Sequence, residues 1–146
     1  MESVEERLEG IIKSTFEKAG EVRLGPPNMP IIQRALYFKE MEKYLIIALF
    51  DARELDQVFV IEKGSGRALT SGPRSVHLLN LLEGEEGDEF RRLFEERASA
   101  EYIDYLLRVL DIFEIGEESD DFERQISPLF EKLMTVLRLY WISFRT

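Results

Sequence analysis

The spacing of apolar residues divides the chain into a first helix, a group of strands and a helical second half. From Val4 to Phe16, apolar residues recur every three or four positions with Glu and Lys between them, which predicts an amphipathic helix. Ser3 and Glu6 match a capping box, in which each side chain satisfies a free backbone N–H of the other residue. We therefore expect the helix to begin after Ser3 and to end at Gly20.

The middle of the chain loses this helical period. Consecutive apolar residues at 44–50, rich in β-branched and aromatic types, predict a strand that is buried on both faces. Further strands are expected at 58–62 and 67–71. These strands follow one another closely, so the pattern predicts an antiparallel meander.

Residues 31–43 leave two possibilities open. Ile32, Leu36 and Met41 have helical spacing, whereas the segment RALYF within the same stretch is typical of a strand. The preceding segment GPPNMP reads as a rigid loop within one domain.

From Ser75 onward the period returns to that of a helix. We expect about four helices in this half, at 75–84, 89–98 and 99–116 and in a last stretch whose apolar stripe begins with Phe122 and Ile126. Pro128 interrupts the last apolar stretch, which predicts a new helix start there with Ser127 as its cap. The expected fold class is α+β, with an N-terminal helix, a three- to four-stranded antiparallel meander and a C-terminal cluster of helices. We expect one domain spanning residues 1–146.

The segment GSGR, which begins at Gly64, is the stretch most similar to a phosphate-binding loop. A dinucleotide fingerprint needs a third glycine, but Leu69 stands in its place, and no G-K-[ST] follows for a P-loop. Glycines between two apolar runs instead favour a tight turn, because glycine readily adopts positive φ. Gly64 and Gly66 therefore predict a hairpin that joins the strands at 58–62 and 67–71.

The charge balance limits the classes of partner. The chain has 19 basic and 29 acidic residues, for a formal net charge of −10. An acidic surface repels nucleic acid and anionic lipid, whereas a basic protein would be attracted to it. The N-terminus is acidic where a signal peptide would be basic, and the longest apolar runs are too short to cross a membrane. These features predict a cytoplasmic protein that binds neither nucleic acid nor membrane.

The residues that could carry catalysis or bind a metal form no recognisable motif. The chain has no cysteine, and His77 is its one histidine, so a zinc site or a cysteine nucleophile is not expected. The acidic segments at 83–89 and 114–123 do not follow the EF-hand spacing. We therefore predict a non-enzymatic protein with no metal and no cofactor.

The acidic segments and the last helix supply the candidate contact residues. The C-terminal stretch has more apolar residues than one buried stripe needs, and aromatic residues and Met are favoured at interfaces. We expect a basic protein partner to be met by acidic loops, and the apolar surplus to support partner binding or a homodimer. The candidate residues are Glu85, Glu86, Asp88, Phe130, Met134, Tyr140, Trp141 and Phe144.

Two resemblances agree with a binding role. Residues 44–82 contain a buried strand, an acidic loop, a second strand, the G-x-G-R hairpin and the helix SVHLLNLL, and this order resembles SUKH-type toxin-immunity proteins. That resemblance implies a small acidic α+β protein that binds and neutralises a toxin. An N-terminal helix followed by a meander is also similar to type III secretion chaperones. The prediction is an acidic binding protein of the immunity, inhibitor, chaperone or adaptor type; the alternative is an enzymatic or small-ligand domain with a pocket between sheet and helices.

Overall fold

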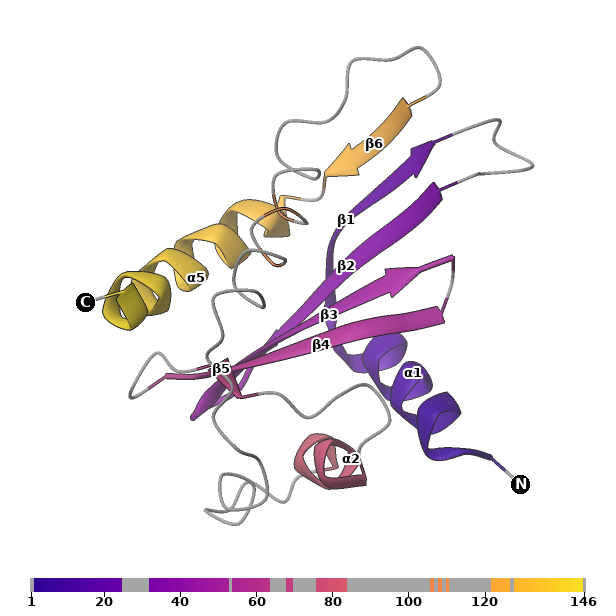
Figure 1. Ribbon diagram of the computed structural model, residues 1–146, viewed down its shortest axis with the longest axis horizontal. Coiled ribbons are helices and arrows are strands. Elements are labelled where there is room, and N and C mark those ends of the chain that lie inside the picture. The colour runs from indigo at the N-terminus through magenta and orange to yellow at the C-terminus, as the bar shows by residue number, and fades with distance from the viewer. Residues whose placement is uncertain are drawn as a thin grey trace.

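The fold was analysed in a computed structural model of the chain. It describes residues 2–24, 32–52, 54–63, 68–69, 76–83, 106, 108, 110, 122–126 and 128–145. Within these residues the chain is an α+β protein in which helices pack on an antiparallel sheet (Figure 1).

The first helix, α1, spans Val4–Thr15 and begins where the sequence predicts. The Oγ of Ser3 accepts a hydrogen bond from the backbone N–H of Glu6 at 3.1 Å, so Ser3 caps the helix. The predicted end at Gly20 is wrong. The chain leaves the helix at Phe16, which is extended, and Gly20 lies inside the next strand.

Four strands then form the meander. β1 spans Glu17–Leu24, β2 spans Ile32–Glu40, β3 spans Tyr44–Asp51 and β4 spans Glu54–Glu62. Each pairs antiparallel with the next. The open question about residues 31–43 is therefore answered by a strand, and β1 is a strand that the apolar pattern did not predict.

Two shorter strands extend the sheet at its edges. β5, Ala68–Leu69, pairs antiparallel with Val60 and Ile61 of β4, so the predicted hairpin after β4 is confirmed. Its turn, with Gly64 and Gly66, lies outside the described residues. β6, Phe122–Ile126, pairs with β1 at the opposite edge, which gives the order β5-β4-β3-β2-β1-β6.

The C-terminal half contains fewer described helices than expected. α2, Val76–Leu82, and α5, Leu129–Arg145, are both at predicted places, and α5 begins directly after Pro128. The segment Phe122–Ile126 was assigned to a helix by its apolar spacing, and this assignment is wrong because the segment is a strand. The helices predicted for 89–98 and 99–116 lie outside the described residues, apart from helical positions at 106, 108 and 110.

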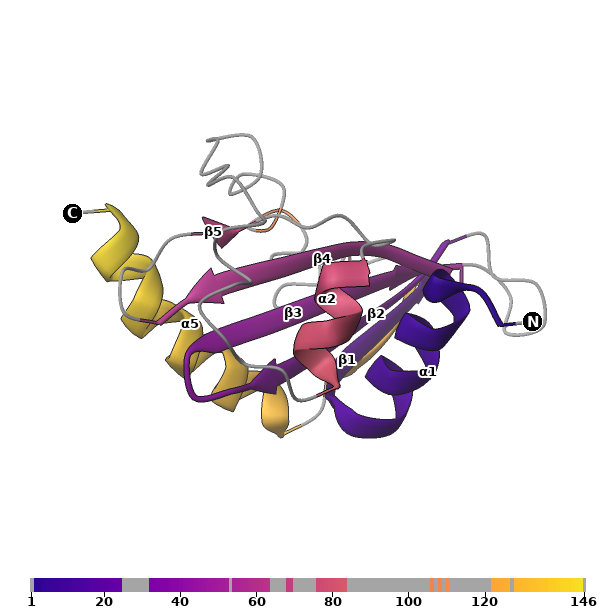
Figure 2. The same cartoon turned by 90° about the horizontal axis from the view of Figure 1, so that it is seen from below.

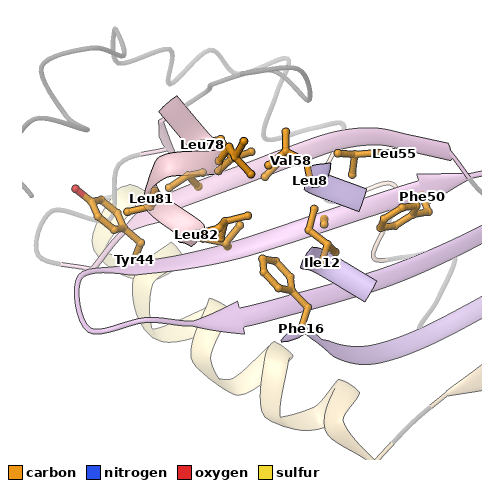
Figure 3. Close-up of a cluster of buried hydrophobic side chains, with 14 residues drawn as sticks. Leu8, Ile12, Phe16, Tyr44, Phe50, Leu55, Val58, Leu78, Leu81 and Leu82 are labelled. Atoms are coloured by element: carbon orange, nitrogen blue, oxygen red, sulfur yellow. The ribbon is translucent and has the colours of Figure 1, made fainter. Parts of the chain in front are cut away.

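Helices cover both faces of the sheet, and successive residues of β3 point to opposite faces. On one face α1 and α2 lie side by side over the sheet (Figure 2), and their side chains join Tyr44, Ile46, Ala48 and Phe50 in one core cluster (Figure 3). On the other face α5 and residues 106 and 110 pack against Leu45, Ile47 and Leu49. β3 is thus buried on both faces, as predicted.

Candidate partner-binding site

Two of the predicted contact residues on α5 have described side chains, and both contact the hydrophobic core. Phe130 is 3% exposed and packs with Leu133 and Leu137 against the sheet, because these three positions share one stripe of the helix. Phe130 therefore belongs to the core rather than to a free surface. Met134 is half-buried and packs at the border of the same cluster.

The remaining positions of the predicted apolar surface are Tyr140, Trp141 and Phe144. All three lie within the backbone of α5, but their side chains are outside the described part of the structure. Leu139, which precedes them, is 64% exposed and is the one large exposed apolar side chain among the described residues.

The predicted acidic loop can be located only at its beginning. Glu85, Glu86 and Asp88 lie outside the described residues. Glu83 is exposed and forms an ion pair with Arg7 of α1, so the start of this loop lies beside the first helix. His77 lies in α2, and its side chain is outside the described part of the structure.

Tertiary structure adds a residue of α1 to the acidic loop between the strands at 44–50 and 58–62. The Oε1 atom of Glu9 on α1 accepts a hydrogen bond from the backbone N–H of Leu55 at 3.1 Å, which brings the helix to the start of β4. The acidic residues Glu54 and Asp56 flank Leu55, and Asp51 pairs in register with Glu54 across the β3–β4 turn. We call Glu9, Asp51, Glu54 and Asp56 the acidic end.

The geometry of this turn explains why its carboxylates are displayed. The β3–β4 register shifts so that Leu49 faces Gln57 while Phe50 faces Leu55, which leaves Asp56 as the extra residue of a bulge. Glu54 and Asp56 are exposed, and Asp51 is half-buried. The bulge therefore presents carboxylates to solvent at one end of the sheet.

Positive charge lies beside the acidic end as well, because Arg34 of β2 pairs in register with Asp51. The Nζ atom of Lys13, one turn after Glu9 on α1, lies 5.1 Å from the ring centroid of Phe50. This distance allows a cation–π interaction with the ring. Arg53 lies outside the described residues.

The sequence contained part of the signal for the acidic end. Asp51, Glu54 and Asp56 are close together in the chain, at the acidic loop between the strands at 44–50 and 58–62, but they were not named as contact residues. The approach of Glu9 depends on how α1 packs across the sheet, and no local pattern encodes that contact.

The described interior is apolar on both faces of the sheet. No polar or charged residue is classed as buried among the described residues, and no group of three or more potential metal ligands occurs among them. One polar atom is an exception within a half-buried residue: Nε of Arg34 on β2 is buried and has no hydrogen-bond partner. No helix within the described ranges is long and apolar enough to span a membrane.

Comparison with known proteins gives no relative from which a role could be transferred. No protein-family model, no curated protein and no solved structure matches the chain.

Proposed function

We propose that this protein is a non-enzymatic binding protein that holds a basic protein partner through acidic surface groups. The observation that carries the proposal is the acidic end, where Asp51, Glu54 and Asp56 lie at the β3–β4 turn and Glu9 of α1 hydrogen-bonds the backbone between Glu54 and Asp56. Like charges placed this close repel one another, and a basic partner would relieve that repulsion.

The packing of the sheet favours a binding site on the surface over a ligand pocket between the sheet and the helices. The described interface between α1, α2 and the sheet is filled by leucine, isoleucine, valine and aromatic side chains (Figure 3). The α5 side is filled in the same way. A pocket between sheet and helices, which the alternative function requires, would have to displace these side chains, whereas a surface partner displaces none.

The acidic end should act mainly on the rate of encounter. An exposed ion pair contributes only about 0–1 kcal/mol, while complementary charge accelerates association and loses its effect as salt is added. Salt screens exposed charges beyond about 8 Å at physiological ionic strength. A partner held this way should therefore associate more slowly at higher ionic strength, with a nearly constant dissociation rate.

The test begins with affinity capture of partners from a lysate of the source cells, followed by association kinetics with the captured protein. A double variant, Glu54→Gln with Asp56→Asn, removes two charges from the acidic end. The matched control, Glu42→Gln with Glu131→Gln, removes two exposed charges from the β2–β3 turn and from α5. We expect the first variant to associate about tenfold more slowly at low salt and the control to remain near the original rate.

Two results would contradict the proposal. Association that is indifferent to salt and to both variants would show that the acidity serves solubility alone. Equal slowing by both variants would show an effect of net charge without a localised surface. The predicted loop residues are tested in the same assay by Glu85→Gln, Glu86→Gln and Asp88→Asn.

The apolar residues of α5 support a second component of the same proposal. Leu139 is 64% exposed, and the sequence that follows it on the helix includes Tyr140, Trp141 and Phe144. We propose that this part of α5, with Met134 at its border, adds apolar contact area to the protein partner or to a second copy. Sedimentation of the pure protein at increasing concentration separates these outcomes, since only a second copy raises the mass of the isolated protein.

A further inference from the structure

The outer face of α5 carries both signs of charge and a large apolar side chain. The exposed side chains of this helix, among those described, are Glu131, Lys132, Thr135, Arg138 and Leu139. Their spacing of three and four residues places them along one face, opposite the stripe with Phe130, Leu133 and Leu137 that packs on the sheet. Leu139 is 64% exposed within this face. The outer face of α5 is therefore open to contact with another molecule.

Charge separates α5 from the remainder of the chain. Lys132, Arg138 and Arg145 against Glu131 give α5 a charge of +2, so the rest of the chain carries −12 within the net charge of −10. Two copies of an acidic protein repel each other, and this repulsion is weakest where the surface is not acidic. A basic partner, in contrast, is attracted to the acidic end and repelled by α5. Charge therefore favours a different occupant for α5 than for the acidic end.

The order of charges along α5 is complementary to itself in an antiparallel arrangement. Glu131 and Arg138 are seven residues apart, which is about two helical turns, so they lie on the same flank of the outer face. A two-fold axis that passes midway between them, next to Thr135, relates two antiparallel copies of the helix. This axis places Glu131 of each copy opposite Arg138 of the other. Two identical ion pairs then form across the contact, and no like charges meet on this flank.

The other positions of the outer face also fit this arrangement. On the second flank the same axis sets Leu139 opposite Lys132 of the other copy, whose methylene stem can cover the leucine. The ammonium group of Lys132 lies 3.5 Å from a carboxylate oxygen of Glu17, so its charge is already balanced within one copy. At the centre, the Oγ1 atom of Thr135 donates a hydrogen bond to the backbone carbonyl of Glu131 at 2.9 Å, so contact between the two threonines leaves no hydroxyl donor unsatisfied.

We infer that the outer face of α5 joins two copies of this chain in a two-fold symmetric homodimer with the two α5 helices antiparallel. The inference rests on the proposed role of α5 as a contact surface, and it names a second copy as the occupant. A contact made by one helix from each copy belongs to the small, transient class of interface. The ion pairs between Glu131 and Arg138 mainly fix the orientation, and Leu139 supplies the apolar contact.

Sedimentation equilibrium of the pure full chain tests the homodimer. Over concentrations from about 10 µM to about 1 mM, which cover weak association, we expect the average mass to rise from that of one chain toward that of two. Glu131→Arg and Arg138→Glu should each remain monomeric, because each change sets like charges opposite one another. An equimolar mixture of these two variants should form a heterodimer, and the double variant should dimerise again.

Two further variants separate this contact from the acidic end. Leu139→Gln should weaken dimerisation about fivefold to tenfold, because it removes apolar contact area. The control, Glu54→Gln with Asp56→Asn, should not weaken it. No basic partner is present in this assay, so its outcome is independent of whether the acidic end binds one. Circular dichroism of each variant checks that the fold is retained, since all the changed positions are exposed.

The inference is overturned if the original protein stays monomeric over the whole concentration range. It is also overturned if the original protein dimerises but the mixture of Glu131→Arg and Arg138→Glu does not, because the two copies then meet through another surface or in another orientation.

Discussion

At the scale of single residues, Gly10 and Ala52 are each an unfavourable residue type for the backbone conformation at their position. Gly10 lies in the middle of α1, where a Cβ atom would meet nothing within 4 Å. Ala52, in the β3–β4 turn, has a φ of 51°, in the left-handed region that favours glycine. A helical glycine costs stability through its entropy in the unfolded chain, and a left-handed alanine costs stability through steric strain.

We predict that replacing Gly10 by alanine and replacing Ala52 by glycine each stabilise the protein. Gly10→Ala should raise the free energy of unfolding by about 1 kcal/mol, and Ala52→Gly by about 0.5–1 kcal/mol. Urea denaturation measures both, and the double variant should show additive gains because the sites share no contact partner in the description. A loss of stability in Ala52→Gly would mean that the turn does not hold a positive φ in solution.

The predictions that were wrong concern residues whose type or spacing is compatible with more than one kind of local structure. Gly20 is a common helix terminator, but Phe16 had already become extended, and Gly20 is followed by residues that pair with β2 and β6. Phe122 and Ile126 are spaced like the core residues of a helix, yet their pairing with β1 places them in a strand. Spacing of four residues is compatible with one face of either element, so the partner strand decided the outcome.

At the scale of elements, the side chain of Glu9 hydrogen-bonds α1 to the backbone of the sheet. The carboxylate of Glu9 accepts the Leu55 N–H at a partly buried position, next to the bulge at Asp56. A buried backbone donor that loses its acceptor costs about 1–3 kcal/mol. The capping of α1 by Ser3 could be read from the sequence because it is local, whereas this contact could not because it joins residues far apart in the chain.

We predict that Glu9→Ala lowers the free energy of unfolding by about 1–2 kcal/mol and accelerates hydrogen exchange at the Leu55 amide. Glu9→Gln should lose less stability, because its amide oxygen can still accept the bond. Glu6→Gln, an exposed change on the same helix that keeps the capping-box pattern, serves as the control and should leave Leu55 exchange unchanged. Equal protection of Leu55 in Glu9→Ala and the original protein would contradict this role.

At the scale of the whole molecule, the sheet is the middle layer between two helical layers. The strand order β5-β4-β3-β2-β1-β6 places β3 and β2 at the centre, where the apolar run was already evident in the sequence. The fold class and the meander could be predicted for that reason. The closing contact, in which β6 pairs with β1, joins distant parts of the chain and has no local signal. The acidic end was missed for the same reason.

The helix α5, which covers one face of the sheet, carries two leucines that differ in burial. Leu133 is 0% exposed against the sheet and Leu139 is 64% exposed. We predict that Leu133→Ala lowers the free energy of unfolding by about 2–5 kcal/mol, because it removes buried methyl groups and leaves a cavity. Leu139→Ala should change it by less than about 0.5 kcal/mol. Comparable effects of the two changes, measured by urea denaturation, would mean that α5 does not pack on the sheet in this orientation.

The double burial of β3 has a consequence for how the chain is made. One face of the strand can be covered early in synthesis, since α1 precedes it and α2 follows soon after. The other face, with Leu45, Ile47 and Leu49, receives residues 106 and 110 and then α5, the last element of the described chain. A nascent chain therefore carries a short, uncharged, strand-forming segment with one apolar face incompletely covered until α5 emerges. Segments of this kind associate with one another readily. Premature termination before α5 should thus yield aggregates instead of a smaller folded protein.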